Sequence, residues 1–169
     1  MKLTLLLSTL ALAACGMSLW RVPPVVHRPE AMPNPPRSPA EISSISLNRH
    51  GCLGPCPQYT FTVSADSAAR YDGGCFTLLP GVYEAPLDTA AFSGVARLLL
   101  ASDYFRSDTL LGLMIDQPDA VIYVTLKDGR ERTVWYGPRH WELAGRIEDV
   151  VRVFPWRNVA PAHLPECAT

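Results

Sequence analysis

The sequence predicts an α+β domain, in which an antiparallel sheet built from hairpins carries two helices packed on one face. Three observations predict this class: short segments alternate between apolar and polar residues, two longer segments repeat apolar residues at helical spacing, and turn signals separate the segments. Strands in hairpins, then a helix, then another hairpin and helix favour a sheet with helices on one side. Residues 43–157 have the length of a single α+β domain with one core.

The first half of this domain has the pattern of strands. Alternating or β-favouring segments predict four of them, at residues 45–50, 58–65, 69–72 and 75–79. The segment between the first two, residues 51–57, contains two prolines and two glycines and is predicted to be a loop. Gly73 and Gly74 are expected to form a hairpin turn between the last two strands.

The second half combines helices with one more hairpin. Asp88 is expected to cap a helix that ends near Ser102, because Phe92, Val95, Ala96 and Leu99 repeat at helical spacing. Residues 121–126 and 131–136 flank the turn signal of residues 127–130 and predict a hairpin. A last helix begins near Pro138, with an apolar face made of Trp141, Ala144, Ile147, Val151 and Phe154.

The N-terminus has the charge and hydropathy of an export signal, residues 1–14. Lys2 precedes an apolar run of about ten residues, which is too short for the roughly 20-residue span of a bilayer. The following Leu12-Ala13-Ala14-Cys15 resembles the lipobox of bacterial lipoproteins, although a plain signal with a chance cysteine is the alternative. The resemblance implies cleavage before Cys15, acylation of that cysteine (palmitate) and anchoring in the membrane. Gly16, in place of aspartate, then favours the outer membrane facing the periplasm.

The domain is flanked by two segments without regular patterning. Residues 15–42 are expected to be a lipid-anchored linker, since seven of the twenty residues from Arg21 to Ala40 are proline and favour an extended spacer. A P-x-x-P ligand for an aromatic groove is the functional alternative. Residues 158–169 are expected to be a C-terminal tail.

Charge and cysteine content agree with export. A net charge of −1 argues against a nucleic-acid partner. Once Cys15 is acylated, four cysteines remain, an even number that indicates disulfides in an oxidising compartment and allows three pairings. Proximity favours Cys52 with Cys56, which leaves Cys75 with Cys167 to fix the tail to the domain.

The residues around the first cysteine pair carry a resemblance to a known family. The run S-L-N-R-H-G-C-L-G-P-C-P-Q-Y, continued by Y-D-G at residues 71–73, is similar to exported bacterial domains of unknown function with the signature S-L-x-R-x-x-C-F-G-x-C-P-x-Y. The likeness spans about residues 44–153. Leu53 and Ser67 depart from the family's usual phenylalanine and glycine. No activity is known for that family, so the resemblance implies a fold and no mechanism.

Arg49 is the charged residue whose position is most unusual. It shares a strand face with Ile45 and Leu47, so we expect it to point inward, where a guanidinium requires a carboxylate partner. The expected partner is Asp116, with Asp66 as the alternative, and the pair is interpreted as a structural ion pair. His140, at the start of the last helix, is interpreted as a surface residue.

The C-x-x-x-C-P motif also resembles the copper-binding motif of chaperones for cytochrome oxidase assembly. Two thiolates from Cys52 and Cys56, with His50 as a third ligand, would suit Cu(I). That motif opens a helix in the copper proteins, whereas here a strand follows it, so we expect a structural disulfide, no metal and no cofactor. No catalytic motif is recognisable.

Two functional hypotheses therefore remain. The first is a non-catalytic, lipid-anchored envelope protein that binds another envelope component. The second is a periplasmic thiol-redox or copper-handling protein that uses Cys52 and Cys56.

Overall fold

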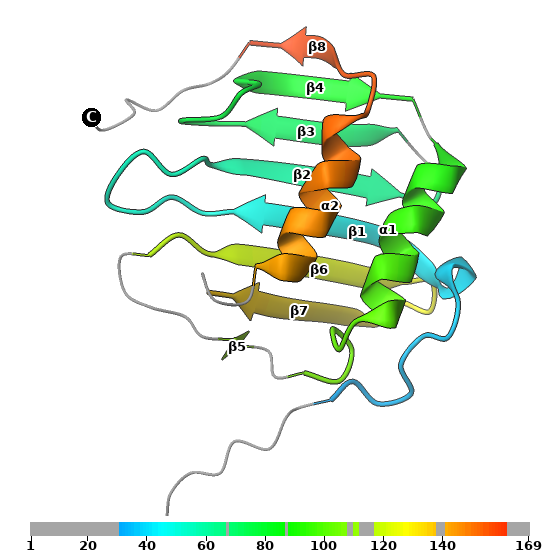
Figure 1. Ribbon diagram of the computed structural model, residues 1–169. Coiled ribbons are helices and arrows are strands. Elements are labelled where there is room, and N and C mark those ends of the chain that lie inside the picture. Colours follow the sequence, from blue (N-terminus) through cyan, green and yellow to red (C-terminus); the bar gives the residue numbers. More distant parts are fainter. Residues whose placement is uncertain are drawn as a thin grey trace, which may run out of the picture.

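One eight-stranded sheet forms the centre of the molecule (Figure 1). The structure is a computed structural model and describes residues 31–66, 68–86, 88–107, 110–111, 117–137 and 141–161. Its strands are β1 (Ile42–Arg49), β2 (Tyr59–Ser64), β3 (Ala69–Gly73), β4 (Gly81–Ala85), β5 (Leu110–Leu111), β6 (Ala120–Leu126), β7 (Glu131–Tyr136) and β8 (Arg157–Ala160). Its helices are the short 3-10 helix η1 (Pro39–Glu41), α1 (Thr89–Ala101) and α2 (Glu142–Arg152).

The strand order is β5-β7-β6-β1-β2-β3-β4-β8. All neighbouring strands are antiparallel except β5 and β7, which are parallel. Strand β1 lies in the interior of the sheet, so that Leu47 faces Phe61 of β2 on one side and Ile122 of β6 on the other. The prediction of an α+β fold with an antiparallel sheet is confirmed.

Both helices contribute apolar residues to the core. Asp88 caps α1 by accepting hydrogen bonds from the backbone N–H groups of Ala90 and Ala91, at 2.9 and 3.0 Å. Figure 1 shows α1 and α2 in front of the same face of the sheet. The buried residues of α1 are those of the predicted stripe, Phe92, Val95, Ala96 and Leu99; those of α2 are Leu143, Ala144, Ile147 and Val151.

The loop between β3 and β4 differs from the prediction. Residues 75–79 were expected to form a strand after a two-residue turn, but β4 begins at Gly81 and residues 74–80 form a longer loop. Gly73 ends β3 so close to the returning chain that a Cβ atom there would lie 1.9 Å from the carbonyl oxygen of Leu79. Cys75 is buried in this loop, which takes the chain off the strand path. The prediction of a strand at residues 75–79 is therefore wrong.

Residues beyond the predicted domain limits also pack against the sheet. The N-terminal strap, residues 31–41, falls in the expected linker, yet Met32 is buried and its N–H donates to the carbonyl oxygen of Phe105 at 2.9 Å. At the other end, β8 pairs with β4 and extends the fold to Ala160, into the expected tail. Within the described ranges, no helix is long and apolar enough to cross a membrane.

Candidate functional site

A buried ion pair joins the sheet to α2. Arg49, the last residue of β1, is 8% exposed, as its alternation with Ile45 and Leu47 predicts. Its Nε lies 3.4 Å from Oε1 of Glu148, whose side chain is 22% exposed. The inward orientation of Arg49 is thus as expected, but its carboxylate partner comes from α2. The expected partner Asp116 lies outside the described residues, and the alternative, Asp66, is exposed.

Two aromatic residues complete the surroundings of this ion pair. The guanidinium carbon of Arg49 lies 3.9 Å from the ring centroid of Trp141, a cation–π contact. The hydroxyl of Tyr59 donates to the same Glu148 oxygen at 2.6 Å. Burial, and then this hydrogen bond to Glu148, raise the pKa of Tyr59 well above its ordinary value. The phenol therefore remains a neutral donor, and Glu148 has its charge balanced by two donors.

The Arg49 guanidinium still has donors to spare. It makes no hydrogen bond to any of the described residues beyond its ion pair with Glu148. No buried side-chain nitrogen or oxygen in the described part of the chain lacks a partner, so any guanidinium N–H without one is not fully buried. Arg49 is among the residues that line the adjoining cavity. A guanidinium carries five N–H donors in a planar fork that fits a carboxylate.

That cavity is a cleft of about 530 Å³, here called the Arg49 cleft. Its floor is aromatic: Tyr59 stacks on Tyr71 at 5.2 Å between centroids, and Tyr71 contacts Trp156 at 5.7 Å. Burial raises the pKa of Tyr71 to about 12. The other lining residues come from α2, with Glu148, Val151 and Arg152, and from the β3–β4 loop, residues 76–79. The lining residues therefore combine three charged side chains, those of Arg49, Glu148 and Arg152, with aromatic and aliphatic ones.

The β3–β4 loop holds its apolar side chains at the mouth of the cleft. Phe76 is 41% exposed and Leu78 is 93% exposed. Phe76 has a φ of 58°, in the left-handed region that a bulky residue rarely adopts. Such backbone strain persists where surrounding structure enforces it, and it is concentrated at ligand clamps and switch regions. Sequence reasoning missed this loop, because its residues had been assigned to a strand.

The predicted disulfide between Cys52 and Cys56 is confirmed. Their Cα atoms are 5.7 Å apart, and the bond closes the loop that leads from β1 to Pro57 at the edge of the Arg49 cleft. Cys75 is also disulfide-bonded, and it is 3% exposed. Cys167, its predicted partner, and Cys15, the predicted lipidation site, lie outside the described residues.

His50, the alternative third copper ligand, contacts Asp119, which precedes β6, and Trp135 of β7. Its Nδ1 lies 2.9 Å from Oδ1 of Asp119, and its ring is 5.2 Å from that of Trp135. The sulfurs of Cys52 and Cys56 are bonded to each other here, and the described residues contain no group of three or more metal-ligating side chains. His140 lies outside the described residues.

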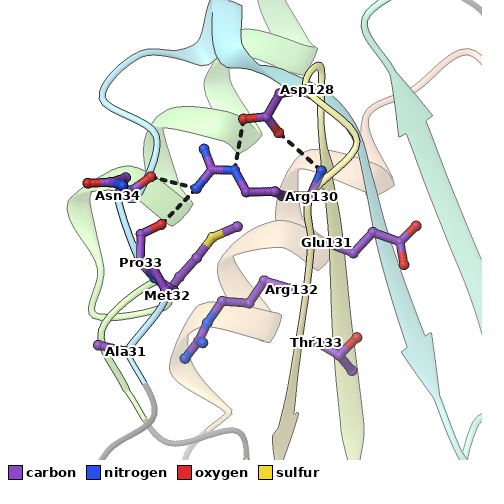
Figure 2. Close-up of a pocket in the computed structure, with 9 residues that line it drawn as sticks. All are labelled: Ala31, Met32, Pro33, Asn34, Asp128, Arg130, Glu131, Arg132 and Thr133. Atoms are coloured by element: carbon purple, nitrogen blue, oxygen red, sulfur yellow. Dashed lines mark hydrogen bonds and ion pairs between the residues drawn. The ribbon is translucent and has the colours of Figure 1, made fainter.

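A second cavity, of about 700 Å³, lies where the N-terminal strap meets the β6–β7 hairpin (Figure 2). Arg130 extends from the hairpin to the strap and donates to the carbonyl oxygens of Pro33 and Asn34, at 2.7 and 2.9 Å. Its Nε is paired with Asp128 at 2.8 Å. Arg132 is buried and donates to the carbonyl oxygen of Tyr104. Both arginines thus hold backbone, so this cavity is part of the strap's attachment.

Comparison with known families gives the domain its classification. No curated protein and no solved structure matches the chain. Residues 43–149, more than half of the 169 residues, match the model of a family described as a domain of unknown function. This agrees with the predicted kind of domain, and all of β1 except Ile42, the disulfide loop and most of α2 fall inside the match. The chain belongs to the family of domains of unknown function DUF6438.

Proposed function

We propose that the protein is a lipid-anchored module of the cell envelope that binds a ligand or partner in the Arg49 cleft. The lipobox-like sequence before Cys15 supports the anchor. The strap supports the arrangement, because it is held at the β6–β7 hairpin, toward one edge of the sheet. The cleft lies over β2 and β3, toward the other edge. A tether attached at the strap leaves the cleft free to meet a partner.

The observation that carries the binding role is a guanidinium with N–H donors to spare among the lining residues of a largely aromatic cleft. A cavity of about 530 Å³ is within the size range of small-molecule sites, which combine apolar walls with a few converging polar groups. Among its described lining residues there is no histidine, cysteine or aspartate, and Glu148 is engaged by Arg49 and Tyr59. These groups suit recognition better than proton transfer or nucleophilic attack.

Acyl labelling and fractionation test the anchor. Wild-type protein should incorporate a labelled fatty acid and sediment with outer membranes. The Cys15→Ser variant should do neither, and labelling that persists in it would refute the anchor. Gly16→Asp should move the protein to the inner membrane, and unchanged fractionation would refute the sorting proposal.

Crosslinking in intact cells tests the cleft with a matched pair of variants. Leu78→Ser changes a 93% exposed leucine at the mouth, and Leu53→Ser changes an 84% exposed leucine in the disulfide loop that does not line the cleft. The first should reduce the yield of specific crosslinks and the second should not. Equal effects of the two changes would contradict binding in the cleft.

A thiol-redox role is the second candidate function. The observation that favours it is the Cys52–Cys56 disulfide, whose two residues are partly exposed. This role requires the pair to exchange with small dithiols and, in the copper version, the reduced pair to bind Cu(I). Loss of stoichiometric Cu(I) binding or of thiol exchange in Cys52→Ser/Cys56→Ser, with the fold retained, would establish it over a structural disulfide.

A further inference from the structure

We propose that the ligand of the Arg49 cleft is a fatty acid, an unbranched apolar chain with one terminal carboxylate. The carboxylate would bind the guanidinium of Arg49, and the chain would lie on the floor formed by Tyr59, Tyr71 and Trp156. This inference rests on the proposed binding function of the cleft and specifies its ligand class.

The charges that line the cleft select an anion. Arg49 and Arg152 are opposed by Glu148 alone, which leaves one positive charge in excess among the described lining residues. The ion pair with Glu148 joins Nε of Arg49 to Oε1 at 3.4 Å, and the guanidinium has further N–H donors that can bind a second carboxylate. Arg152 is 70% exposed, and its Nη1 lies as far as 4.0 Å from Oδ1 of Asp149. Its charge is therefore weakly paired and can attract an anionic ligand. The same aromatic floor would suit a quaternary ammonium, but two arginines disfavour a cation.

The polar groups of the cleft are too few for a peptide. A bound peptide brings an N–H and a carbonyl for each residue, and these must find partners when they leave water. Away from Arg49 and Glu148, the described lining residues are mostly aromatic and aliphatic, and their further polar groups are the Arg152 guanidinium and the hydroxyls of Tyr59, Tyr71 and Thr77. The hydroxyl of Thr77 already donates to the carbonyl oxygen of Gly74 at 3.1 Å. A fatty acid needs polar partners for its carboxylate alone, so the aromatic and aliphatic lining residues can cover the rest of its chain.

The strained Phe76 fits a clamp over such a chain. Its left-handed backbone, at φ 58°, holds an exposed ring next to the exposed Leu78. Together they present apolar surface that a single bound chain would cover. Phe76→Gly removes the ring, and glycine adopts this backbone conformation without strain. The variant should therefore fold normally, so that any loss of binding can be assigned to the missing ring.

The experiment compares three ligands with one chain length and different head groups. The full chain carrying Cys15→Ser, prepared in an oxidising compartment without detergent, is titrated below micellar concentration with dodecanoate, methyl dodecanoate and dodecyltrimethylammonium. Calorimetry and tryptophan fluorescence report binding. We expect one dodecanoate per chain and affinity for the ester and the cation lower by about tenfold or more, the value of a charged hydrogen bond. Equal or tighter binding of the ester or the cation would overturn the proposal.

Variants locate the binding and keep the test decisive. Arg49→Gln should remove the preference for the acid over the ester. If that variant does not fold, Leu78→Ser and Phe76→Gly should each weaken dodecanoate severalfold, while Leu53→Ser leaves it unchanged. A leucine-terminated peptide that displaces dodecanoate, while its amide does not, would overturn the fatty acid in favour of a peptide C-terminus. If the protein does not bind dodecanoate but Leu78→Ser reduces crosslinking more than Leu53→Ser does, the fatty acid is rejected and the binding function is retained. If dodecanoate does not bind and the two variants crosslink equally, the proposed binding function is rejected as well.

Discussion

Replacing Arg49 by methionine should lower the free energy of unfolding by about 2–3 kcal/mol. Removing one partner of a fully buried ion pair costs about 3–5 kcal/mol, because the other charge is left unpaired. Here the partner, Glu148, is 22% exposed and keeps the hydrogen bond from Tyr59, which reduces the penalty toward the lower end. Loss of the cation–π contact with Trp141 adds up to about 1 kcal/mol, partly replaced by packing of the methionine chain.

Urea denaturation followed by tryptophan fluorescence measures this loss, and a double variant isolates its cause. Glu148→Gln removes the charge but retains an oxygen that can accept the hydrogen bond from Tyr59. Arg49→Met/Glu148→Gln should therefore be more stable than Arg49→Met alone, by about 1 kcal/mol or more, since no carboxylate is left unpaired. A loss below about 1 kcal/mol in Arg49→Met, the range of exposed pairs, would refute the buried ion pair. Strict additivity of the two single changes would refute the coupling.

Three further predictions concern other parts of the fold. Cys52→Ser/Cys56→Ser should lower Tm by only a few degrees, since this disulfide closes a loop far shorter than the 15 residues that give about 3 kcal/mol; a collapse of the thermal transition would contradict this. Arg130→Ala should release the strap, so that a protease cleaves within residues 31–41. Arg106→Ala, which removes the exposed ion pair with Asp103, should not increase this cleavage. Equal cleavage of the two variants would show that Arg130 does not hold the strap. Alkaline pH should destabilise the domain, because burial raises the pKa of Tyr71, Tyr104 and Tyr136 in the folded state, whereas an unfolded tyrosine loses its proton near pH 10. The free energy of unfolding should therefore be complete below pH 10 and should fall by about 1.4 kcal/mol per pH unit for each such tyrosine between pH 10 and 12. A flat stability profile in that range would contradict the burial of these three tyrosines.

Periodicity predicted the parts of the fold in which local pattern and burial coincide. Strand β2 and helix α1 were located to within one or two residues, because one face of each is buried along its whole length. The same rule predicted that Arg49 points inward. The β3–β4 loop was missed because its residues are apolar for another reason: Cys75 is disulfide-bonded and buried, and Phe76 and Leu78 line a cleft.

The partner of Arg49 was beyond local pattern. Glu148 follows Ile147 on α2, 99 residues from Arg49, and only the packing of that helix against β1 and β2 brings the two together. A glutamate at the border of the apolar stripe of α2 was the available signal. The aromatic floor likewise joins strands β2 and β3 to Trp156, which lies beyond α2, so no single segment of sequence contains it.

The central position of β1 imposes an order on folding. Its neighbour β2 follows directly in sequence, but its other neighbour, β6, begins 71 residues after β1 ends. During synthesis the β1–β2–β3 meander can pair early, while the second edge of β1 stays unpaired until the chain has advanced past α1. An open strand edge of this kind is a template for intermolecular pairing. The nascent domain is therefore most prone to aggregate in that interval, and a chaperone that covers strand edges would act there.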